Sequence, residues 1–506
     1  MSKPPQLALL AFLITCLSGL LWLLLLWNIG VHSPDTSWHL ATGRWILSEG
    51  SVPRLDPFCY TSEGLAWTNL NWLAQVVFAG VYERLGFTGL AALRLVLLSA
   101  ILGFGWLNLR ARRVPPTLGL IALGLLAAGL VFVTSIRPRL FTLALLSAFA
   151  WILARPDPEE RLGVGPALGL ACLLLVWNHL HGGFVYGYCL LGAEAGACAI
   201  SSWRRRGPWL PLRSRWLIGV ALLGLGSFAL HPHGFDPLWH VANYNARMGD
   251  QVIRQTTEVL PLDFTTGVGR YVQLGLALGV LACVFGRRPR LRDVLATLPF
   301  LQFCLQMRRG VNPLAIVGLP WVAESYGPLW RERPWARALD RRFALSWRSA
   351  GASLLLLVAT STAVHLALEA SPGKQRDLED RAWRGASLPV AAVRAIRDAG
   401  GQGRVFSRWP QGGTVIWGLY PERRAHADGR TDFHGQGGAI AEGQRIADRL
   451  PGWHERLAEL EVEFALLERG TPLAQALAER SEWRMFHEDP IYVVLRREPA
   501  RRARSQ

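Results

Sequence analysis

The stretch SPDTSWHLATGRWILSEGSVPRLDPFCYT, residues 33–61, closely follows an apolar run from Leu7 to Ile29. A helix needs about 20 apolar residues to cross a bilayer. This run is longer than the roughly 7 to 15 apolar residues of a signal-peptide core, and no small-x-small cleavage site follows it. The sequence therefore predicts a membrane anchor at the N-terminus, followed by a loop that holds acids, a histidine and tryptophans.

Apolar runs recur through most of the chain, which has 506 residues and is 51% hydrophobic. We expect about eleven transmembrane helices, at 7–29, 88–109, 117–134, 140–154, 164–177, 183–200, 216–230, 271–286, 291–305, 311–325 and 350–369. The stretch WLAQVVFAGVYERLG (72–86) is shorter and carries Glu83 and Arg84, so we interpret it as a helix on the membrane surface. The fold class that follows is a polytopic α-helical membrane protein.

Arginine-rich segments indicate how the chain is oriented. The net charge is +17, and four basic clusters lie between apolar runs, at 110–113, 201–215, 286–292 and 330–348. With eleven spans and a cytoplasmic N-terminus, all four fall inside, as the positive-inside rule requires. This distribution favours a multi-pass protein of the bacterial inner (plasma) membrane over a nucleic-acid-binding protein. The C-terminus is then extracytoplasmic.

From residue 371 the composition changes to that of a soluble domain. The segments RVFS, GGTVIWGL, VEFALLE, WRMFHE and IYVVLRR read as strands, and AIAEGQRIADRL and LAQALAERS read as helices. We therefore expect a transmembrane domain over residues 1–370, with a first extracytoplasmic loop at 30–87. A small α/β extracytoplasmic domain follows at 371–506.

Under this topology, most of the polar residues outside the basic clusters lie in loops at the outer face. Besides the first loop, these are SIRPRLF (135–141), WNHLHGGF (177–184), HPHGFDP (231–237) and QMRRGVNP (306–313). Ionisable groups near membrane depth are costly and tend to face a cavity or a ligand. Arginines on the side that the positive-inside rule depletes suit a phosphate, because a guanidinium donates two hydrogen bonds and stays charged. The candidates are Arg137, Arg139, Arg308 and Arg309, and the alternative is that each extends to lipid headgroups.

Two His-x-His pairs, His179 with His181 and His231 with His233, raise the question of a metal site. Alternate residues share a face on a strand but not on a helix, so the spacing alone does not define a site. We favour hydrogen bonds to a sugar or to loop backbone for these histidines. Asn178, next to His179, and His39 of the first loop are further substrate-binding candidates. A divalent metal is left open as a cofactor, and no residue is assigned to it.

A carboxylate beside a phosphate pocket can act as a general base, taking a proton from an attacking hydroxyl as the phosphate leaves. Asp35, shortly after the first span, is better placed for this role than Asp56, whose RLDPF setting is typical of an Asp-Pro turn. Asp56 is kept as a substrate-binding candidate. The competing interpretation of Asp35 is that it caps the helix beginning near TSWHLATGRWIL.

The chain also resembles a known family. WHLATGRWILSEGSVPRLDPFCYTSEGLAWTNLNWL (38–73), the surface segment ending YERLG, and the following GLAALRLVLL resemble the GT-C superfamily of membrane glycosyltransferases, over residues 1 to about 110. That superfamily includes protein O-mannosyltransferases, aminoarabinose transferases and oligosaccharyltransferases. The HADGRTDFHGQ segment (426–436) is similar to soluble parts of uncharacterised bacterial GT-C-like proteins.

The resemblance implies an enzyme that moves a sugar from a polyprenyl-phosphate donor to a hydroxyl of a glycan, lipid or protein acceptor. The acidic side chain of Asp35 would be the catalytic group. Several family members carry an Asp-Glu pair here, whereas Thr36 follows Asp35 in this chain. Two alternatives stay open. A transporter or flippase of a lipid-linked or anionic substrate should show buried acids in mid-span and an inverted repeat. A non-catalytic membrane scaffold that acts through DGRTD (428–432) of the terminal domain should show outer loops that do not converge on one cavity.

Overall fold

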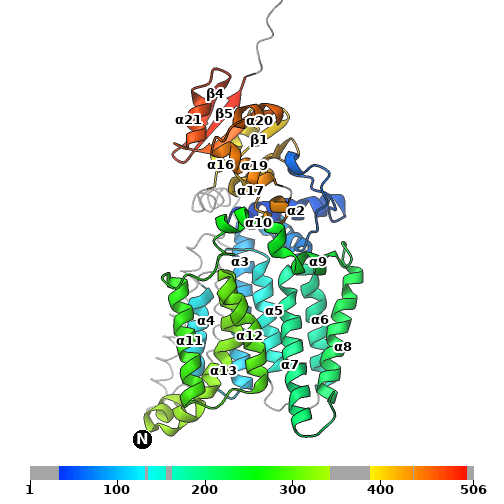
Figure 1. The fold of residues 1–506 in the computed structure, drawn as a ribbon, viewed down its shortest axis with the longest axis vertical. Helices are drawn as coiled ribbons and strands as arrows, with labels where there is room; N and C mark the ends of the chain where they lie inside the picture. Colours follow the sequence, from blue (N-terminus) through cyan, green and yellow to red (C-terminus); the bar gives the residue numbers. More distant parts are fainter. Residues whose placement is uncertain (1–32, 131–134, 155–161, 342–387, 437, 499–506) are drawn as a thin grey trace, which may run out of the picture.

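The computed structural model describes residues 33–130, 135–154, 162–341, 388–436 and 438–498. A bundle of long helices forms one part of the molecule, and a smaller α/β part lies on one end of it (Figure 1). Between the two lie α2 (Pro34–Glu49), α9 (Asp236–Ala242) and α10 (Tyr244–Gln255). We call the end of the bundle that carries these three helices the capped end, and the opposite end the open end.

The bundle helices form from the apolar runs of the sequence. They are α3 (Trp72–Ala111), α4 (Pro116–Leu130), α5 (Arg139–Leu153), α6 (Val164–Leu180), α7 (Val185–Arg204), α8 (Leu212–Gly226), α11 (Gly267–Phe285), α12 (Leu291–Gln306) and α13 (Val311–Glu332). Short 3₁₀ helices lie in the connections, at η1 (Tyr60–Ser62), η2 (Gly182–Phe184), η3 (Ser227–Leu230) and η4 (Arg308–Gly310). Large apolar side chains such as Trp177 and Phe149 are fully buried in the bundle core.

The number of clear membrane spans is smaller than the sequence predicts. Among the described residues, three helical stretches are long and apolar enough to cross a membrane, Trp72–Ala111, Gly182–Arg204 and Gly267–Phe285. The apolar helices α4, α5 and α6 have 15, 15 and 17 residues, so they extend about 22 to 26 Å, less than the ~30 Å of a hydrocarbon core. The expected spans 7–29 and 350–369 lie outside the described residues. The described helices thus support a helical membrane protein with three clear spans in place of about eleven.

The predicted surface helix and the span after it form one element, α3, which has 40 residues. The helix is broken at Gly86, whose φ of 59° and ψ of −152° are not helical. A positive φ strains any residue with a Cβ, so glycine permits this sharp change of direction. The break lies where the sequence places the boundary between the surface segment and the span.

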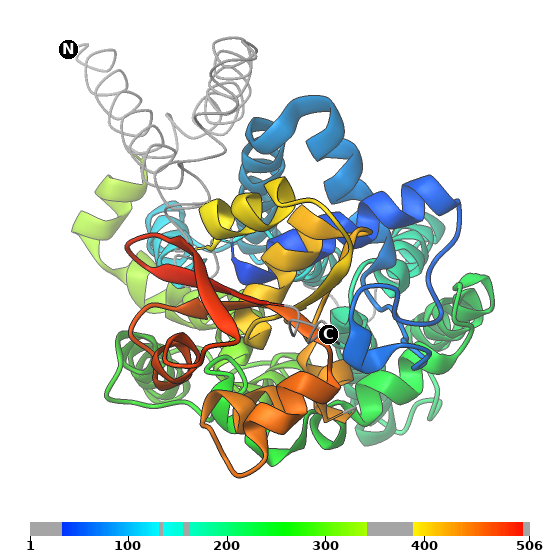
Figure 2. The same cartoon turned by 90° about the horizontal axis from the view of Figure 1, so that it is seen from above.

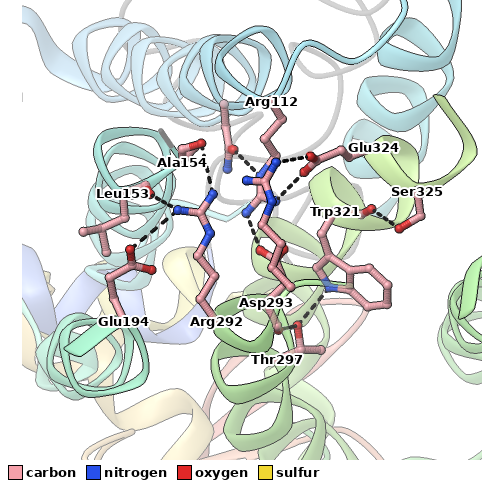
Figure 3. A network of polar contacts seen from close by, with 12 residues as sticks. Arg112, Leu153, Ala154, Glu194, Arg292, Asp293, Thr297, Trp321, Glu324 and Ser325 are labelled. Atoms are coloured by element: carbon pink, nitrogen blue, oxygen red, sulfur yellow. Dashed lines mark hydrogen bonds and ion pairs between the residues drawn. The ribbon is translucent and has the colours of Figure 1, made fainter. Parts of the chain in front are cut away.

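Charged side chains from several helices meet at the open end (Figure 3). Arg112, at the end of α3, donates to Asp293 of α12 at 2.7 Å and to Glu324 of α13 at 2.9 Å. Arg292 lies 3.5 Å from Glu194 of α7. These groups are largely buried, and each is paired, as buried charges must be. The basic segments around Arg112 and Arg292 therefore lie at one end of the bundle, opposite the α/β part.

The α/β part contains one five-stranded sheet with strand order β2-β1-β3-β5-β4. Its strands are β1 (Gly403–Phe406), β2 (Arg423–Ala425), β3 (Val462–Glu468), β4 (Trp483–Glu488) and β5 (Tyr492–Arg497). Strands β2, β1 and β3 run parallel, whereas β5 pairs antiparallel with β3 and β4. Its helices are α16 (Val390–Asp398), α17 (Trp409–Leu419), α18 (Thr431–Gln436), α19 (Ala439–Ala447), α20 (Trp453–Glu459) and α21 (Pro472–Ala478). A small α/β fold was predicted for this region, and the structure confirms it.

One predicted strand is wrong. The segment GGTVIWGL, residues 412–419, belongs to helix α17. A short apolar run that is buried on all sides has the same pattern in a helix and in a strand, and Pro410 in the first turn favours the helix. Helix α17 packs against α2, which crosses the end of the bundle beneath the α/β part (Figure 2). Gly413 permits this contact, since a Cβ there would lie 2.6 Å from the carbonyl oxygen of Pro34.

The first loop is built into the α/β part. The backbone N–H of Ala425 in β2 donates to the carbonyl oxygen of Phe58 at 3.2 Å, next to a bridge between Cys59 and Ala425. The side chains of Phe58 and Trp67 are buried in one apolar core with Phe464 of β3. Sequence-distant segments therefore share a core at the capped end. Where the domain boundary falls, at 370/371 or elsewhere, stays a prediction.

Candidate functional site

Asp35 lies in the first turn of α2, at the capped end. Its Oδ2 is 3.2 Å from Nη1 of Arg137, and Nε1 of Trp38 donates to its Oδ1 at 3.3 Å. Gly429 of the α/β part packs closely against this carboxylate. A Cβ at Gly429 would lie 2.1 Å from Oδ1, so a larger residue would not fit there. Burial raises the pKa of Asp35 above its ordinary value, although Arg137 acts in the opposite direction. A carboxylate with a raised pKa is a better proton acceptor than an exposed one.

Asp35 does not cap the helix, so that interpretation is wrong. Ser33 holds the N-cap position with extended backbone, and its N–H donates to Oγ1 of Thr36 at 3.2 Å. The capping box formed by Ser33 and Thr36 satisfies the end of the helix without Asp35. Asp35 therefore points its charge at Arg137 and Trp38 and is left for another role.

Two of the four candidate arginines meet on one acid. Arg137 donates to Glu258 at 2.8 Å and to Oγ of Ser33 at 3.0 Å, and Arg139 donates to the other oxygen of Glu258 at 3.3 Å. Burial would raise the pKa of Glu258, but Arg139 and Arg137 hold it below its ordinary value. Glu258 comes from the segment between α10 and α11 and was missed in the sequence. It stands in no motif, so only the fold could reveal it.

The other two candidate arginines, Arg309 and Arg308, have different surroundings. Arg309 lies over the ring of Tyr244, with Cζ 4.6 Å from the ring centroid, and donates to its hydroxyl at 3.3 Å. Its backbone N–H donates to the carbonyl oxygen of Glu258 at 3.1 Å, which ties η4 to the Arg137 group. Arg308 acts electrostatically on Asp263 instead: the pKa of Asp263 is lowered first by hydrogen bonds from Thr265 and less by Arg308. The arginine cluster of the site is therefore Arg137, Arg139 and Arg309.

Three of the four histidines in the His-x-His pairs form a separate group under the first loop. The rings of His179 and His231 stack with centroids 5.1 Å apart, and Trp72 meets both edge-on. Nδ1 of His231 accepts from the backbone N–H of His233 at 3.1 Å, and Nε2 of His233 accepts from that of Asn69 at 3.3 Å. These contacts to loop backbone are one of the two uses that the sequence predicts.

His181 lies apart from that group and closer to the arginine cluster. Its Nδ1 accepts from the backbone N–H of Gly183 at 2.9 Å and is 3.0 Å from Oγ1 of Thr142. Burial, with smaller contributions from Arg309 and Arg139, lowers the pKa of His181 to about 3. His181 is therefore neutral at physiological pH and able to donate a hydrogen bond from Nε2.

The remaining candidates hold structural contacts. Asn178 donates from Nδ2 to the carbonyl oxygen of Gly224 at 2.8 Å inside the bundle. His39 is buried between α2 and α3, where its Nδ1 is 3.2 Å from Nε2 of Gln75. Asp56 is buried too and lies 2.8 Å from Nη1 of Arg430. Whether these three also bind a substrate stays a prediction.

Arg430 is the centre of a buried charge network in the DGRTD segment of the α/β part. It pairs with Asp56 of the first loop and with Asp428 at 2.5 Å, and its guanidinium lies 4.4 Å from the ring centroid of Trp67. Burial alone would raise the pKa of Asp428, but Arg430 and His434 hold it well below its ordinary value. The sequence drew attention to DGRTD without indicating that Asp56 is its partner. Asp428 also acts electrostatically on Asp35, so the network borders the site.

One group of side chains in the described part of the chain has the geometry for a metal ion. Ligand atoms of Asp56, Cys59 and His434 lie within 4.8 Å of one another, and all three residues are buried. Arg430 is 2.8 Å from Asp56 and 3.6 Å from Sγ of Cys59. A guanidinium already neutralises the acid at this position, so the donor set does not fit a divalent cation well.

The fold of the chain is similar to that of two solved membrane proteins. The chain superposes on two solved GT-C superfamily glycosyltransferases. One is archaeal oligosaccharyltransferase AglB from Archaeoglobus fulgidus, in complex with an inhibitory peptide and a dolichol-phosphate, with a TM-score of 0.52 and 12% identity over 90% of this chain and 69% of AglB. The other is ArnT from Cupriavidus metallidurans bound to undecaprenyl phosphate, with a TM-score of 0.51 and 15% identity over 96% of this chain and 97% of ArnT.

The resemblance predicted from the sequence is confirmed at the level of fold. At these identities the likeness establishes the architecture and leaves the reaction to be argued from the site. No family model and no curated protein matches the sequence.

Proposed function

We propose that the chain is a glycosyltransferase that moves a sugar from a polyprenyl-phosphate donor to a hydroxyl-bearing acceptor at the capped end. The observation that carries the proposal is the position of Asp35, 3.2 Å from Arg137 in a cluster of three arginines. A base and a set of phosphate-binding groups are the two elements that sugar transfer from a phosphate leaving group requires.

In the proposed reaction, Asp35 takes the proton of the acceptor hydroxyl as its oxygen attacks the anomeric carbon. The bond between that carbon and the phosphate oxygen breaks, and the phosphate leaves with the electron pair. Arg137, Arg139 and Arg309 stabilise the charge that develops on the leaving phosphate. Attack from the side opposite the phosphate inverts the anomeric centre. His181 and the group of His179, His231 and His233 are proposed to orient the sugar or the acceptor.

The structural neighbours add support of a coarser kind. AglB is described with dolichol-phosphate and ArnT with undecaprenyl phosphate, and both ligands are polyprenyl phosphates. A donor of this class is therefore proposed here as well. The convergence of Asp35, Arg137 and Glu258 at one end argues against a scaffold whose loops serve no common site. The proposal names the class of donor and the hydroxyl of the acceptor, and it does not name a particular sugar or acceptor molecule.

The function can be tested by transfer itself. Membranes that contain the chain should release free polyprenyl phosphate from a labelled polyprenyl-phosphate sugar when a hydroxyl acceptor is supplied, and membranes without the chain should not. Uptake or flipping of the intact labelled lipid, with the sugar still attached, would favour the transporter alternative.

Glu258 gives a test of the arginines that does not depend on turnover. A donor phosphate would compete with Glu258 for Arg137 and Arg139, so Glu258→Gln should tighten the binding of undecaprenyl phosphate. Arg137→Ala should weaken it by about 10- to 100-fold, because a charge-assisted contact contributes about 1.5 to 3 kcal/mol. Binding to the purified protein in neutral detergent, measured by native mass spectrometry, gives both values.

The matched control is Arg308→Ala, since Arg308 lies at the same end and acts electrostatically on Asp263 rather than on Glu258. It was predicted from the sequence to bind phosphate, but its position predicts a smaller effect than that of Arg137→Ala. Opposite shifts for Arg137→Ala and Glu258→Gln support the phosphate role. If wild type and both variants bind undecaprenyl phosphate with equal affinity, these arginines only contact lipid headgroups.

We further propose that the open end faces the cytoplasm and the capped end lies outside, with the shorter apolar helices also crossing the membrane. Reporter fusions after Arg206, in the loop between α7 and α8, and after Gly373 should then report opposite sides, because arginine-rich loops are retained inside. The Arg206 fusion should be active with a cytoplasmic reporter and the Gly373 fusion with an extracytoplasmic one. The same reading from both positions would contradict the orientation.

A further inference from the structure

A cavity of about 280 Å³ lies between the bundle and the α/β part, away from Asp35. It is lined by residues of α2, the segment of α3 before the kink, α16 and α17. Its residues include Arg44, nine positions after Asp35 on α2, which corresponds to about 13 Å along the helix axis. The cavity is therefore distinct from the arginine cluster around Glu258.

Three arginines line the cavity, Arg44, Arg394 and Arg397, and none of the described residues that line it is an acid. Arg44 is 3.7 Å from Glu83, which lies outside the lining, and both side chains are about half exposed. An exposed pair of this kind is weak and leaves Arg44 available to a stronger anion. Among the described residues, the lining therefore carries positive side chains and no negative one, which suits an anionic ligand.

The rest of the lining adds aromatic rings and a hydroxyl. Cζ of Arg44 lies 4.0 Å from the ring centroid of Trp417, and Tyr82 meets that ring edge-on. Thr414 also lines the cavity, is 2% exposed, and has no hydrogen-bond partner for its hydroxyl among the described residues. A buried hydroxyl without a partner is costly, so a ligand oxygen that reaches it would be favoured.

We propose that this cavity is a second anion site, which binds a phosphate group carried by a lipid headgroup or by a soluble phosphate. Guanidinium groups bind phosphate oxygens with two parallel hydrogen bonds, so three arginines in one cavity suit a phosphate. The cavity includes Tyr82, just before the kink at Gly86 where the α3 span begins. A headgroup at the membrane surface can therefore reach it, and aromatic residues are enriched at that depth.

The test uses the full chain in neutral detergent with three probes. Short-chain phosphatidylglycerol and a diacylglycerol with the same chains are titrated by native mass spectrometry, and inorganic phosphate is titrated by calorimetry. The variant is Arg394→Gln with Arg397→Gln. The control is Arg469→Gln with Arg484→Gln, which makes the same change in charge on exposed side chains of the same part of the chain. Arg44→Gln is the second variant, on another element.

We expect phosphatidylglycerol to bind at least about tenfold more weakly to the Arg394/Arg397 variant than to wild type and the control, and diacylglycerol to bind weakly to all. The Arg394/Arg397 substitutions should weaken the binding of phosphatidylglycerol by the same factor in an Arg137→Ala background, which separates this site from the donor site. If inorganic phosphate alone binds as tightly and with the same arginine dependence, the ligand is a soluble phosphate. Unchanged affinity for both phosphate probes in both cavity variants would overturn the proposal, as would a wild-type protein that binds neither phosphate probe more tightly than diacylglycerol.

Discussion

Asp35→Asn is expected to lower turnover by roughly 10² to 10⁴-fold while donor binding is retained, because a positioned general base contributes a factor of this size. The amide keeps the size of the side chain and can still accept from Nε1 of Trp38, but it cannot take a proton from the acceptor. The capping box of Ser33 and Thr36 does not involve Asp35, so α2 should form normally. Release of polyprenyl phosphate from a labelled donor, at matched protein levels in membranes, measures the effect.

Asp263→Asn is the matched control, an exposed acid in a loop at the same end whose carboxylate accepts from the N–H and hydroxyl of Thr265. An asparagine can make the same contacts, so this variant should keep wild-type turnover. If Asp35→Asn transfers sugar at a wild-type rate in normally inserted protein, Asp35 is not the base. A loss of donor affinity without a loss of turnover would instead assign Asp35 to holding Arg137 in place.

Arg430→Met is expected to destabilise the capped end by about 3 to 5 kcal/mol, the usual cost of removing one partner from a buried ion pair. Arg430 is 3% exposed and pairs with Asp56 of the first loop and Asp428 of the α/β part, so its loss removes the positive charge beside two buried carboxylates and leaves only His434 next to Asp428. The first loop should then separate more readily from the sheet. Denaturant unfolding and limited proteolysis within residues 50–66 measure the two consequences.

The charge-neutral triple variant, Arg430→Met with Asp56→Asn and Asp428→Asn, is the control for this prediction. It removes the positive and both negative charges together, so most of the lost stability should return. If the single and triple variants are equally unstable, the packing of the guanidinium between Trp67 and its aromatic neighbours holds the loop, and the ion pairs do not.

Several features of the fold could be predicted because they depend on local pattern. The apolar runs gave most bundle helices, and Glu83 and Arg84 separated the surface segment of α3 from the span, where the structure has the break at Gly86. The alternating strands of the α/β part were predicted for β1, β3, β4 and β5. The segment 412–419 was predicted wrongly, because burial on all sides removes the periodicity that separates a helix from a strand.

The site was only partly predictable from the sequence. Asp35, Arg137 and Arg139 were chosen by residue type and by position at span ends, and the structure places them in one cluster. Glu258 was missed because a single acid in a loop carries no local signal. The pairing of Asp56 with Arg430 could not be predicted either, since 374 positions separate the two residues.

The sequence by itself determined that the chain is a helical membrane protein with its basic loops at one end, its other polar residues at the opposite end, and an α/β part after the bundle. These properties follow from hydrophobic length and charge, which each segment carries alone. Only the tertiary structure decided that Asp35 faces Arg137 and that Arg430 joins the first loop to the α/β part. Each of these contacts depends on long-range packing, as at Gly413 and Gly429, where the missing side chain lets two distant segments touch.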